Sequence, residues 1–326
     1  MKKVLVCGGG GFIGHHLASE LMEKAHVIVA DIKPENEYCD VNSYCDSYEY
    51  LDLRSERAWM HLDKIYGSFD EVYQLAADMG GAGYVFSGEN DISIMLNSAQ
   101  INIHCVIYAC RWQAKVFYSS SACMYPSHNQ EDPNNPLCTE SSAYPANPDS
   151  EYGWEKLFSE RLYLAAARNA GLKVSIARFH NIFGPEGTWT GGKEKAPAAI
   201  TRKVIQAKDE VEIWGPGTQT RSFLYIDECV EGVIKLMDNA IQGPVNIGSD
   251  EMISINDLAL MTARIAGKEI KIKNIPGPVG VMGRTSDNTY IKKLLNWTPK
   301  ESLEVGMRKL YTWIKGQIDA SNKPQG

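Results

Sequence analysis

A tyrosine and a lysine four residues apart, with a run of serines earlier in the chain, are the first residues that could do chemistry. Tyr152 and Lys156 have the spacing that places two side chains on one face of a helix. An ammonium group beside the tyrosine would stabilise the phenolate and lower its pKa. Such a tyrosine could exchange a proton with a substrate hydroxyl. Ser121, with its neighbour Ser120, ends an apolar run and could hold the same oxygen.

Three glycines near the start form a second motif. Gly8, Gly11 and Gly14 follow an apolar run typical of a strand and open a helical pattern. Glycine lets the backbone turn tightly and approach a pyrophosphate, and free N–H groups at the helix start can hold that anion. We therefore predict a dinucleotide site here that includes Phe12 and Ile13.

Asp31 ends the second apolar run, 17 residues after Gly14. A carboxylate at this position can accept hydrogen bonds from both adenosine ribose hydroxyls and would repel a 2′-phosphate, so we expect NAD rather than NADP. Other predicted cofactor residues lie at the ends of later apolar runs or in the tyrosine motif: Asp52, Leu53, Leu75, Ala76, Ala77, Ser119, Tyr152 and Lys156.

Strand-like and helix-like segments alternate through the first half of the chain. This order predicts an α/β fold, a Rossmann-type doubly wound parallel sheet, with a smaller mixed α/β substrate domain at the C-terminal end. We expect the dinucleotide domain at 1–178, with a return segment at about 218–250, and mainly substrate binding at 179–326. Helices are predicted at 55–65, 91–112, 152–170, 195–207, 227–239, 254–266 and 302–318.

The composition excludes several classes of protein. The 326 residues carry a net charge of −7, which argues against a broad nucleic-acid surface. No run approaches the roughly 18 consecutive apolar residues of a membrane span, and the glycine-broken start does not fit a signal peptide. The eight cysteines show no C-x-x-C pair and no zinc-ligand spacing. We therefore expect no metal, and a cytoplasmic protein with free thiols.

The glycine pattern, Asp31, Ser121, Tyr152 and Lys156 together resemble the extended short-chain dehydrogenases/reductases that act on nucleotide sugars. Nearly the whole chain is covered by this resemblance. Longer strings are similar to the GDP-mannose 3,5-epimerase family, although Cys7 stands where threonine is usual. These strings are residues 77–83, 120–126, 178–185, 191–198, 219–223, 246–251 and 283–288.

The resemblance implies a redox-neutral reaction in which tightly held NAD first oxidises the sugar at C4 and finally reduces it again. Tyr152, aided by Lys156 and Ser121, would take the C4 hydroxyl proton. Between these steps Cys123 and Lys195 would act on opposite faces of the ring at C5 and C3. GDP-D-mannose would give GDP-L-galactose, or GDP-L-gulose if only C5 is inverted.

The substrate is expected to be a small nucleotide sugar, with a GDP-hexose favoured. Its diphosphate needs cations, and arginine suits phosphate because it can make bidentate contacts. Lys203, Arg221 and Arg284 are the candidates, and Asn181 resembles the family's pyrophosphate- or sugar-contacting asparagine. The remaining predicted substrate contacts are Gly81, Ser121, Cys123 and Lys195.

Several alternatives stay open at this point. A 4,6-dehydratase would carry an Asp-Glu pair where this chain has Ala122 and Cys123, which argues against dehydration. A 4-epimerase or another epimerase on a different nucleotide sugar, an epimerase–reductase resembling GDP-fucose synthase, and a silent NAD-binding scaffold remain. The epimerase–reductase would consume NADPH, which Asp31 opposes. Relatives pair through two helices per subunit, so we also expect a homodimer through 91–112 and 152–170.

Overall fold

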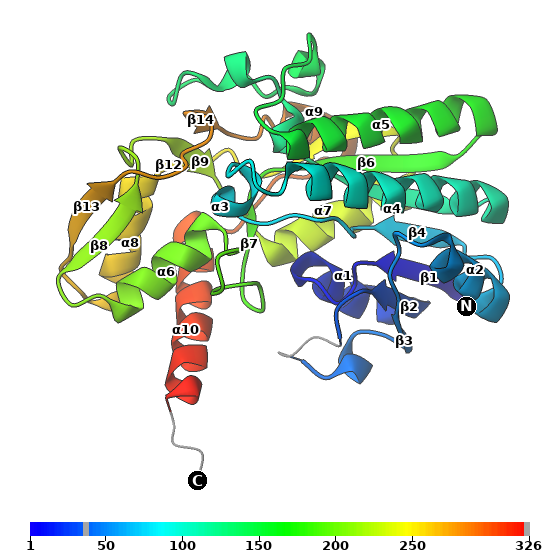
Figure 1. Cartoon of the computed structure of the whole chain (residues 1–326), viewed down its shortest axis with the longest axis horizontal. Coiled ribbons are helices and arrows are strands. Elements are labelled where there is room, and N and C mark those ends of the chain that lie inside the picture. The colour runs from blue at the N-terminus through cyan, green and yellow to red at the C-terminus, as the bar shows by residue number, and fades with distance from the viewer. Residues whose placement is uncertain (35–38, 323–326) are drawn as a thin grey trace.

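The core of the molecule is a seven-stranded sheet in which every neighbouring pair of strands is parallel (Figure 1). A computed structural model describes residues 1–34 and 39–322. The strands are, in spatial order, β11 (Gly243–Ile247), β6 (Lys173–Phe179), β5 (Lys115–Ser121), β4 (Glu71–Gln74), β1 (Lys2–Cys7), β2 (Ala25–Asp31) and β3 (Ser47–Tyr50).

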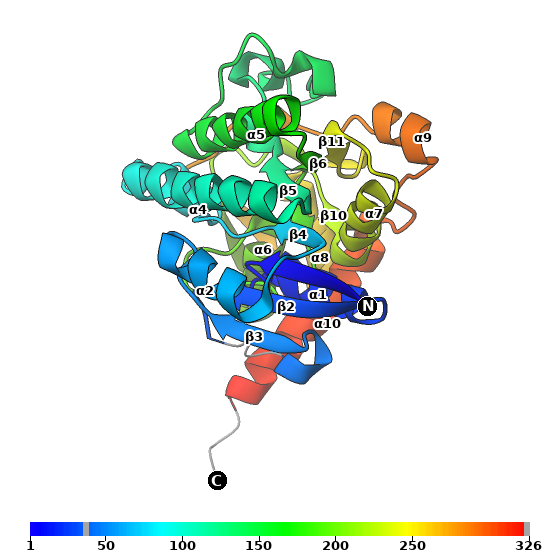
Figure 2. The ribbon, with the colours of Figure 1, turned by 90° about the vertical axis from the view of Figure 1, so that its right-hand side faces the viewer.

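Helices cover both faces of this sheet, as expected for parallel strands joined by crossovers. On one face lie α1 (Phe12–Met22) and α7 (Ile226–Asp238), and on the other α2 (Glu56–Tyr66), α4 (Asp91–Trp112) and α5 (Glu151–Ala170) (Figure 2). The alternation of side chains along β1 shows why both faces are apolar. Val4 and Val6 join the core under α1, whereas Leu5 and Cys7 join the core on the opposite face.

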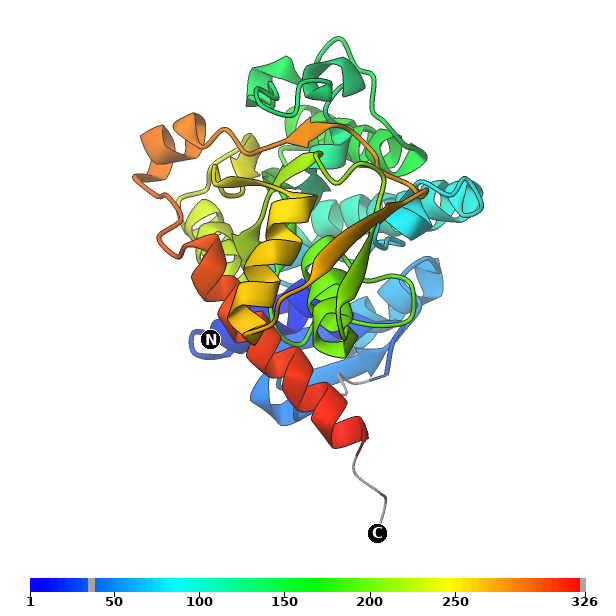
Figure 3. The ribbon, with the colours of Figure 1, turned by 90° about the vertical axis from the view of Figure 1, so that its left-hand side faces the viewer.

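A smaller unit lies beyond the carboxyl ends of the strands (Figures 1 and 3). Its elements are α6 (Ala196–Gln206), α8 (Ile255–Ala266), α10 (Leu303–Ser321), the pair β8 (Glu210–Trp214) and β13 (Lys271–Ile275), and the trio β12 (Met252–Ser254), β9 (Thr220–Ser222) and β14 (Gly283–Arg284). The chain leaves this unit to form α7 and β11, and β11 pairs with β6 at the edge of the large sheet.

The predicted fold class, a doubly wound parallel sheet, is confirmed, and every predicted helix is present with its ends moved by a few residues at most. The sequence did not locate several short elements. Among them are α3 (Ala82–Val85), α9 (Thr289–Leu295), β7 (Ile182–Phe183) and β10 (Leu224–Tyr225). Elements of two to seven residues are too short to establish a hydrophobic period, so tertiary contacts decide them.

A buried ion pair joins α5 to the sheet directly behind the carboxyl end of β5. Arg178 of β6 and Glu160 of α5 meet at 2.8 Å, and both side chains are only 2% exposed. Ser120 donates to the same carboxylate at 2.6 Å, and the Arg178 guanidinium also donates to the Tyr125 hydroxyl at 3.1 Å. This network fixes the end of β5 against the helix that carries Tyr152.

Removal of the Glu160 carboxylate tests this anchoring. Glu160→Ala leaves the Arg178 charge buried without its partner, so the free energy of unfolding should fall by about 3–5 kcal/mol. Glu231→Ala is the matched control, because it removes an exposed pair with Lys235 and should cost about 0.5 kcal/mol or less. Urea denaturation of the three proteins measures both values. Equal, small losses would contradict an anchoring role for the buried pair.

Candidate active site

The start of α1 offers unpaired N–H groups at the carboxyl end of β1. Gly11 caps the helix without a side-chain hydrogen bond, and the first turn carries no acidic residue. The first N–H groups of a helix have no partner within it, and the helix dipole favours an anion there. A Cβ on Gly14 would lie 2.2 Å from the Gly8 oxygen, so only glycine permits this tight loop.

Asp31 lies beside this loop at the end of β2. Its carboxylate accepts hydrogen bonds from the backbone N–H groups of Gly10 at 3.0 Å and Lys33 at 2.9 Å. Burial raises the pKa of Asp31, and the hydrogen bonds from Lys33 and Gly10 act against that rise. The loop and this carboxylate therefore fit a dinucleotide diphosphate and its ribose.

The other predicted cofactor residues follow the ends of neighbouring strands. Asp52 and Leu53 lie after β3, with Asp52 held by Arg54 at 2.7 Å, and Leu75 to Ala77 follow β4. Because the strands are parallel, these positions share one edge of the sheet with the glycine loop and with Ser119. That edge is where an extended dinucleotide would lie.

Tyr152, Lys156 and Ser121 meet at the end of β5. The Lys156 ammonium donates to the Ser119 carbonyl at 2.8 Å and lies 5.7 Å from the centre of the Tyr152 ring. Both side chains are buried, and Ser121 lies near enough to Tyr152 to act on the tyrosine's pKa in the lowering direction. The helical spacing read from the sequence thus places this trio at the expected edge of the sheet.

The net pKa shift of Tyr152 is opposite to the one we predicted. Burial raises the pKa of Tyr152 well above its ordinary value, and the nearby Cys123 raises it further. Ser121 and the charge of Arg284 act in the lowering direction. Burial also lowers the pKa of Lys156. The sequence-based expectation was wrong because it counted the ammonium and omitted the cost of burying a phenolate.

Cys123 follows β5 in a short 3-10 turn over Ala122–Met124, and its N–H donates to Ser121 Oγ at 3.2 Å. Its side chain packs against the small apolar cluster that contains Tyr152. A Cβ on Gly153 would lie 2.2 Å from the Cys123 oxygen, so glycine in the first turn of α5 permits this close approach. The start of α5 and the turn that carries Cys123 are thereby held close together.

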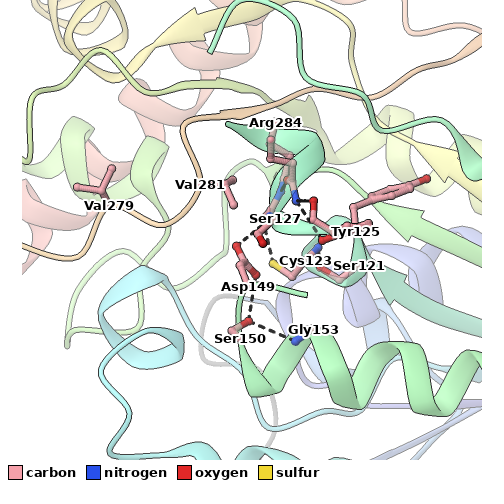
Figure 4. Close-up of polar contacts among 12 residues, drawn as sticks. Ser121, Cys123, Tyr125, Ser127, Asp149, Ser150, Gly153, Val279, Val281 and Arg284 are labelled. Carbon is pink, nitrogen blue, oxygen red and sulfur yellow. Dashed lines mark hydrogen bonds and ion pairs between the residues drawn. The ribbon is translucent and has the colours of Figure 1, made fainter. Parts of the chain in front are cut away.

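Arg284 contacts the sulfur directly (Figure 4). Its Nη1 donates to Cys123 Sγ at 3.1 Å, while Nε and Nη2 bind Gln130 and Asp149. The residue as a whole is 4% exposed. The predicted role of Arg284 toward the substrate diphosphate stays a prediction, and in this structure its Nη1 is directed at the Cys123 sulfur.

Arg221 neighbours Arg284 across the β9–β14 pair. Its guanidinium donates to backbone carbonyls, among them Val281 at 2.7 Å. Burial and the Arg284 charge lower the pKa of Arg221 to about 10. Two adjacent guanidinium groups give this side of the site a strongly positive field, which suits an anionic substrate.

Lys195 precedes α6 in the smaller unit and is half-buried. Burial lowers the pKa of Lys195, whereas the charge of Cys123 raises it, so the two side chains are electrostatically coupled. The Gly81 N–H donates to the Lys193 carbonyl at 3.0 Å and ties this loop to the segment after β4. A desolvated lysine can donate a proton to a carbon and then take up another proton.

Two predicted substrate residues are engaged elsewhere in this structure. Asn181 donates to the Ser222 carbonyl at 2.8 Å. Lys203 donates to the Glu212 carbonyl at 2.8 Å, and burial lowers its pKa. Their roles toward a diphosphate stay predictions. Sequence reasoning missed Asp149 and Gln130, although the place of Asp149, three residues before Tyr152, was a usable signal.

Fold and site together define an oxidoreductase-type nucleotide-binding enzyme with a Ser-Tyr-Lys centre. Residues 4–248 match the model of the NAD dependent epimerase/dehydratase family. The chain therefore belongs to that family, and NAD is its cofactor, as the glycine loop and Asp31 predicted.

The chain is similar to curated relatives over most of its length. It is 44% identical to a GDP-mannose 3,5-epimerase of Arabidopsis thaliana over 97% of this chain and 83% of the relative. A GDP-mannose 3,5-epimerase of Oryza sativa subsp. indica is also 44% identical, over 99% of this chain and 84% of the relative.

Solved structures of more distant proteins share the fold. A UDP-glucuronic acid 4-epimerase from Bacillus cereus, solved with UDP-glucuronic acid and NAD, is 25% identical with a TM-score of 0.80 and covers 97% of this chain and 99% of that one. A Thermus thermophilus UDP-glucose 4-epimerase with NAD has a TM-score of 0.81 at 20% identity, over 96% and 99% of the two chains.

The choice of cofactor can be tested at Asp31. Asp31→Ala removes the carboxylate predicted to hold the ribose hydroxyls, so NAD should bind about 10–100-fold more weakly. Binding of NADP should weaken less or improve, because the repulsion of its 2′-phosphate is lost. Glu20→Ala, an exposed acid on the same α1 helix, is the control. Calorimetric titration of cofactor-stripped protein measures both ligands, and an unchanged NAD to NADP ratio would contradict the assignment.

Proposed function

We propose that the protein catalyses the 3,5-epimerisation of GDP-D-mannose to GDP-L-galactose. The observation that carries the proposal is the place of Cys123. Its side chain packs against the cluster that contains Tyr152, its sulfur accepts a hydrogen bond from Arg284, and its charge acts on Lys195. A 4-epimerase needs no such second acid–base pair. The 44% identical relatives named for this reaction support the same choice of substrate.

When bound, NAD supplies reversible hydride acceptance at C4 of the sugar. Tyr152 takes the C4 hydroxyl proton, and Ser121 holds the same oxygen through its hydroxyl group. Lys156, which is held by its hydrogen bond to the Ser119 carbonyl, orients the tyrosine. Because burial raises the pKa of Tyr152, the cationic groups around it are needed to make proton release practicable.

The two inversions belong to Cys123 and Lys195. A ketone at C4 acidifies the C–H bonds at C3 and C5, so a thiolate can remove a proton from one ring face. Lys195 then returns a proton to the other face, and the same pair acts at the second carbon. Inversion at C5 alone gives GDP-L-gulose, which the same residues would also produce.

Solvent deuterium tests this function. The protein is incubated with GDP-D-mannose in D₂O, and the recovered sugars are examined by proton NMR and mass spectrometry. Deuterium at both C5 and C3, a galacto-configured product and no net change of cofactor are expected. Label at C5 alone would restrict the reaction to that carbon. A changed C4 configuration without any label would instead identify a 4-epimerase and contradict the role of Cys123.

Variants separate the chemical steps. Lys195→Met should lower the rate of inversion at C5 by about 10²–10⁴-fold while C4 oxidation by bound NAD persists, because only the proton donor on the opposite ring face is lost. Lys195 must be protonated to donate. Since burial lowers its pKa below 10.5, inversion should decline on the alkaline side at a pH below 10.5. An unchanged rate of inversion in Lys195→Met would exclude this lysine as the donor.

A homodimer through α4 and α5 is the second part of the proposal. The two helices lie side by side on the surface of the large sheet (Figures 1 and 2). Their outer faces carry a helically spaced set of exposed apolar side chains. These are Ile92, Leu96, Ile103 and Ile107 on α4, and Trp154 and Phe158 on α5. Two copies would bury this face in a four-helix arrangement.

The α4 helix also meets the length and hydropathy of a membrane span, but 39% of that window is buried inside the fold. A helix that forms part of the core of a globular unit passes the same test, so this feature is weak evidence for a membrane.

The described cysteines are all free thiols, which supports a reducing compartment such as the cytoplasm.

Introducing charged side chains into the proposed interface tests whether the protein forms this homodimer. The double variant Leu96→Lys and Ile107→Lys places two ammonium groups in the proposed interface and should convert a dimer into a monomer. Ile65→Lys on α2 is the control, since Ile65 is 56% exposed and lies outside the face. Light scattering after size exclusion reads the mass. A wild-type monomer, or a double variant that stays dimeric, would contradict the interface.

A further inference from the structure

Arg284 is held at three points, and Asp149 supplies the only one of them that carries a fixed negative charge. The carboxylate binds Arg284 Nη2 at 3.0 Å, with the Asp149 side chain 8% and the Arg284 side chain 5% exposed. Gln130 binds Nε on the other side of the guanidinium. The remaining nitrogen, Nη1, faces Cys123 Sγ (Figure 4).

Asp149 is itself fixed by the start of α5. It directly precedes Ser150, which caps the helix by accepting from the Gly153 N–H at 3.3 Å. The Ser150 hydroxyl also donates to Asp149 Oδ1 at 3.3 Å. The helix that presents Tyr152 therefore also presents the carboxylate that holds Arg284.

The neighbouring charges make this contact necessary. Arg221 lies beside Arg284 in the adjacent strand, and the two guanidinium groups repel one another. A planar guanidinium paired to a carboxylate keeps a defined orientation, whereas an unpaired one would swing away from a like charge. Asp149 thus offsets the repulsion and keeps Nη1 directed at the sulfur.

We propose that Asp149 is a positioning residue for the epimerisation, which holds Arg284 so that its guanidinium stabilises the thiolate of Cys123. The proposal rests on the proposed function for its role in catalysis, but the contact itself does not depend on the substrate. In this role Asp149 acts through Arg284. It determines how much of Cys123 is available as a base.

Thiol alkylation tests the contact without any substrate. Iodoacetamide is added at pH 7 to the NAD-bound enzyme, and modification of Cys123 is followed by peptide mass spectrometry. Asp149→Leu keeps the size and removes the acceptor, so alkylation of Cys123 should slow about tenfold or more. Asp149→Asn keeps an oxygen for Nη2 but removes the charge that offsets the repulsion from Arg221, so its rate should lie between those of the wild type and Asp149→Leu.

Two controls accompany these variants. Glu151→Gln changes an exposed acid two positions further along the same segment and should leave the Cys123 rate unchanged. Cys110, half-buried on α4, reports within each sample whether the fold has loosened. Equal rates in the wild type and Asp149→Leu, or equally raised rates in Asp149→Leu and Asp149→Asn, would overturn the positioning role.

Deuterium exchange then links the contact to the chemistry. In Asp149→Leu, exchange at C5 of GDP-D-mannose should fall in the same proportion as alkylation, while oxidation at C4 remains within about threefold. Equal losses in both steps would indicate general damage and overturn the inference. A wild type that exchanges no deuterium would defeat the proposed function instead, and the alkylation result would still decide whether Asp149 positions Arg284.

Discussion

Burial of positive charge at the end of β5 is the constraint on which the rest of the site depends. Lys156, Lys195, Arg221 and Arg284 all approach the volume beside Cys123, and burial disfavours the charged form of each. An isolated buried cation is costly, so each needs an acceptor or an anion. Asp149 partly meets this need at Arg284. The sulfur of Cys123 and an anionic nucleotide sugar are the groups that would complete it.

Two of these buried cations donate to backbone carbonyls rather than to carboxylates. Lys156 donates to the Ser119 carbonyl, and Arg221 donates to carbonyls of the segment before β14, among them Val281. Carbonyl oxygens satisfy the donors without cancelling their charge, so the field at the site stays positive. A carboxylate in those places would weaken the attraction for the diphosphate and the stabilisation of the Tyr152 phenolate. The buried ion pair of Arg178 with Glu160 lies behind the strand, which keeps its charges away from Cys123 and Tyr152.

The sequence predicted those parts of the site that depend on local order along the chain. The glycine loop, Asp31, and the Tyr152 and Lys156 pair each lie within or beside a single strand–helix unit, and periodicity locates such units. Contacts between distant segments were not accessible in this way. Arg284 is 161 positions from Cys123, and no spacing rule connects them. The resemblance placed Arg284 in the site, but only the geometry indicates what it faces.

The sequence also could not show the free-energy cost of burying the charged groups of the site. A motif shows which charges are close, but the cost of desolvation depends on how many atoms surround them. For Tyr152 that cost outweighs the neighbouring cations, and the predicted sign of its net shift was therefore wrong. The short strands of the smaller unit were also not accessible from the sequence, because packing rather than propensity selects their conformation.

The division into two units has a chemical consequence at Cys123 and Lys195. Cys123 follows a strand of the large sheet, whereas Lys195 precedes α6 in the smaller unit. Inversion of a carbon requires acid and base on opposite faces of the sugar, and groups from one strand end would lie on one face. The fold is shared by 4-epimerases of 20–25% identity, so the sheet alone does not select the reaction. In the proposed mechanism, selection would depend on the loop that carries Lys195, and the hydrogen bond from Gly81 to Lys193 ties that loop to the large unit.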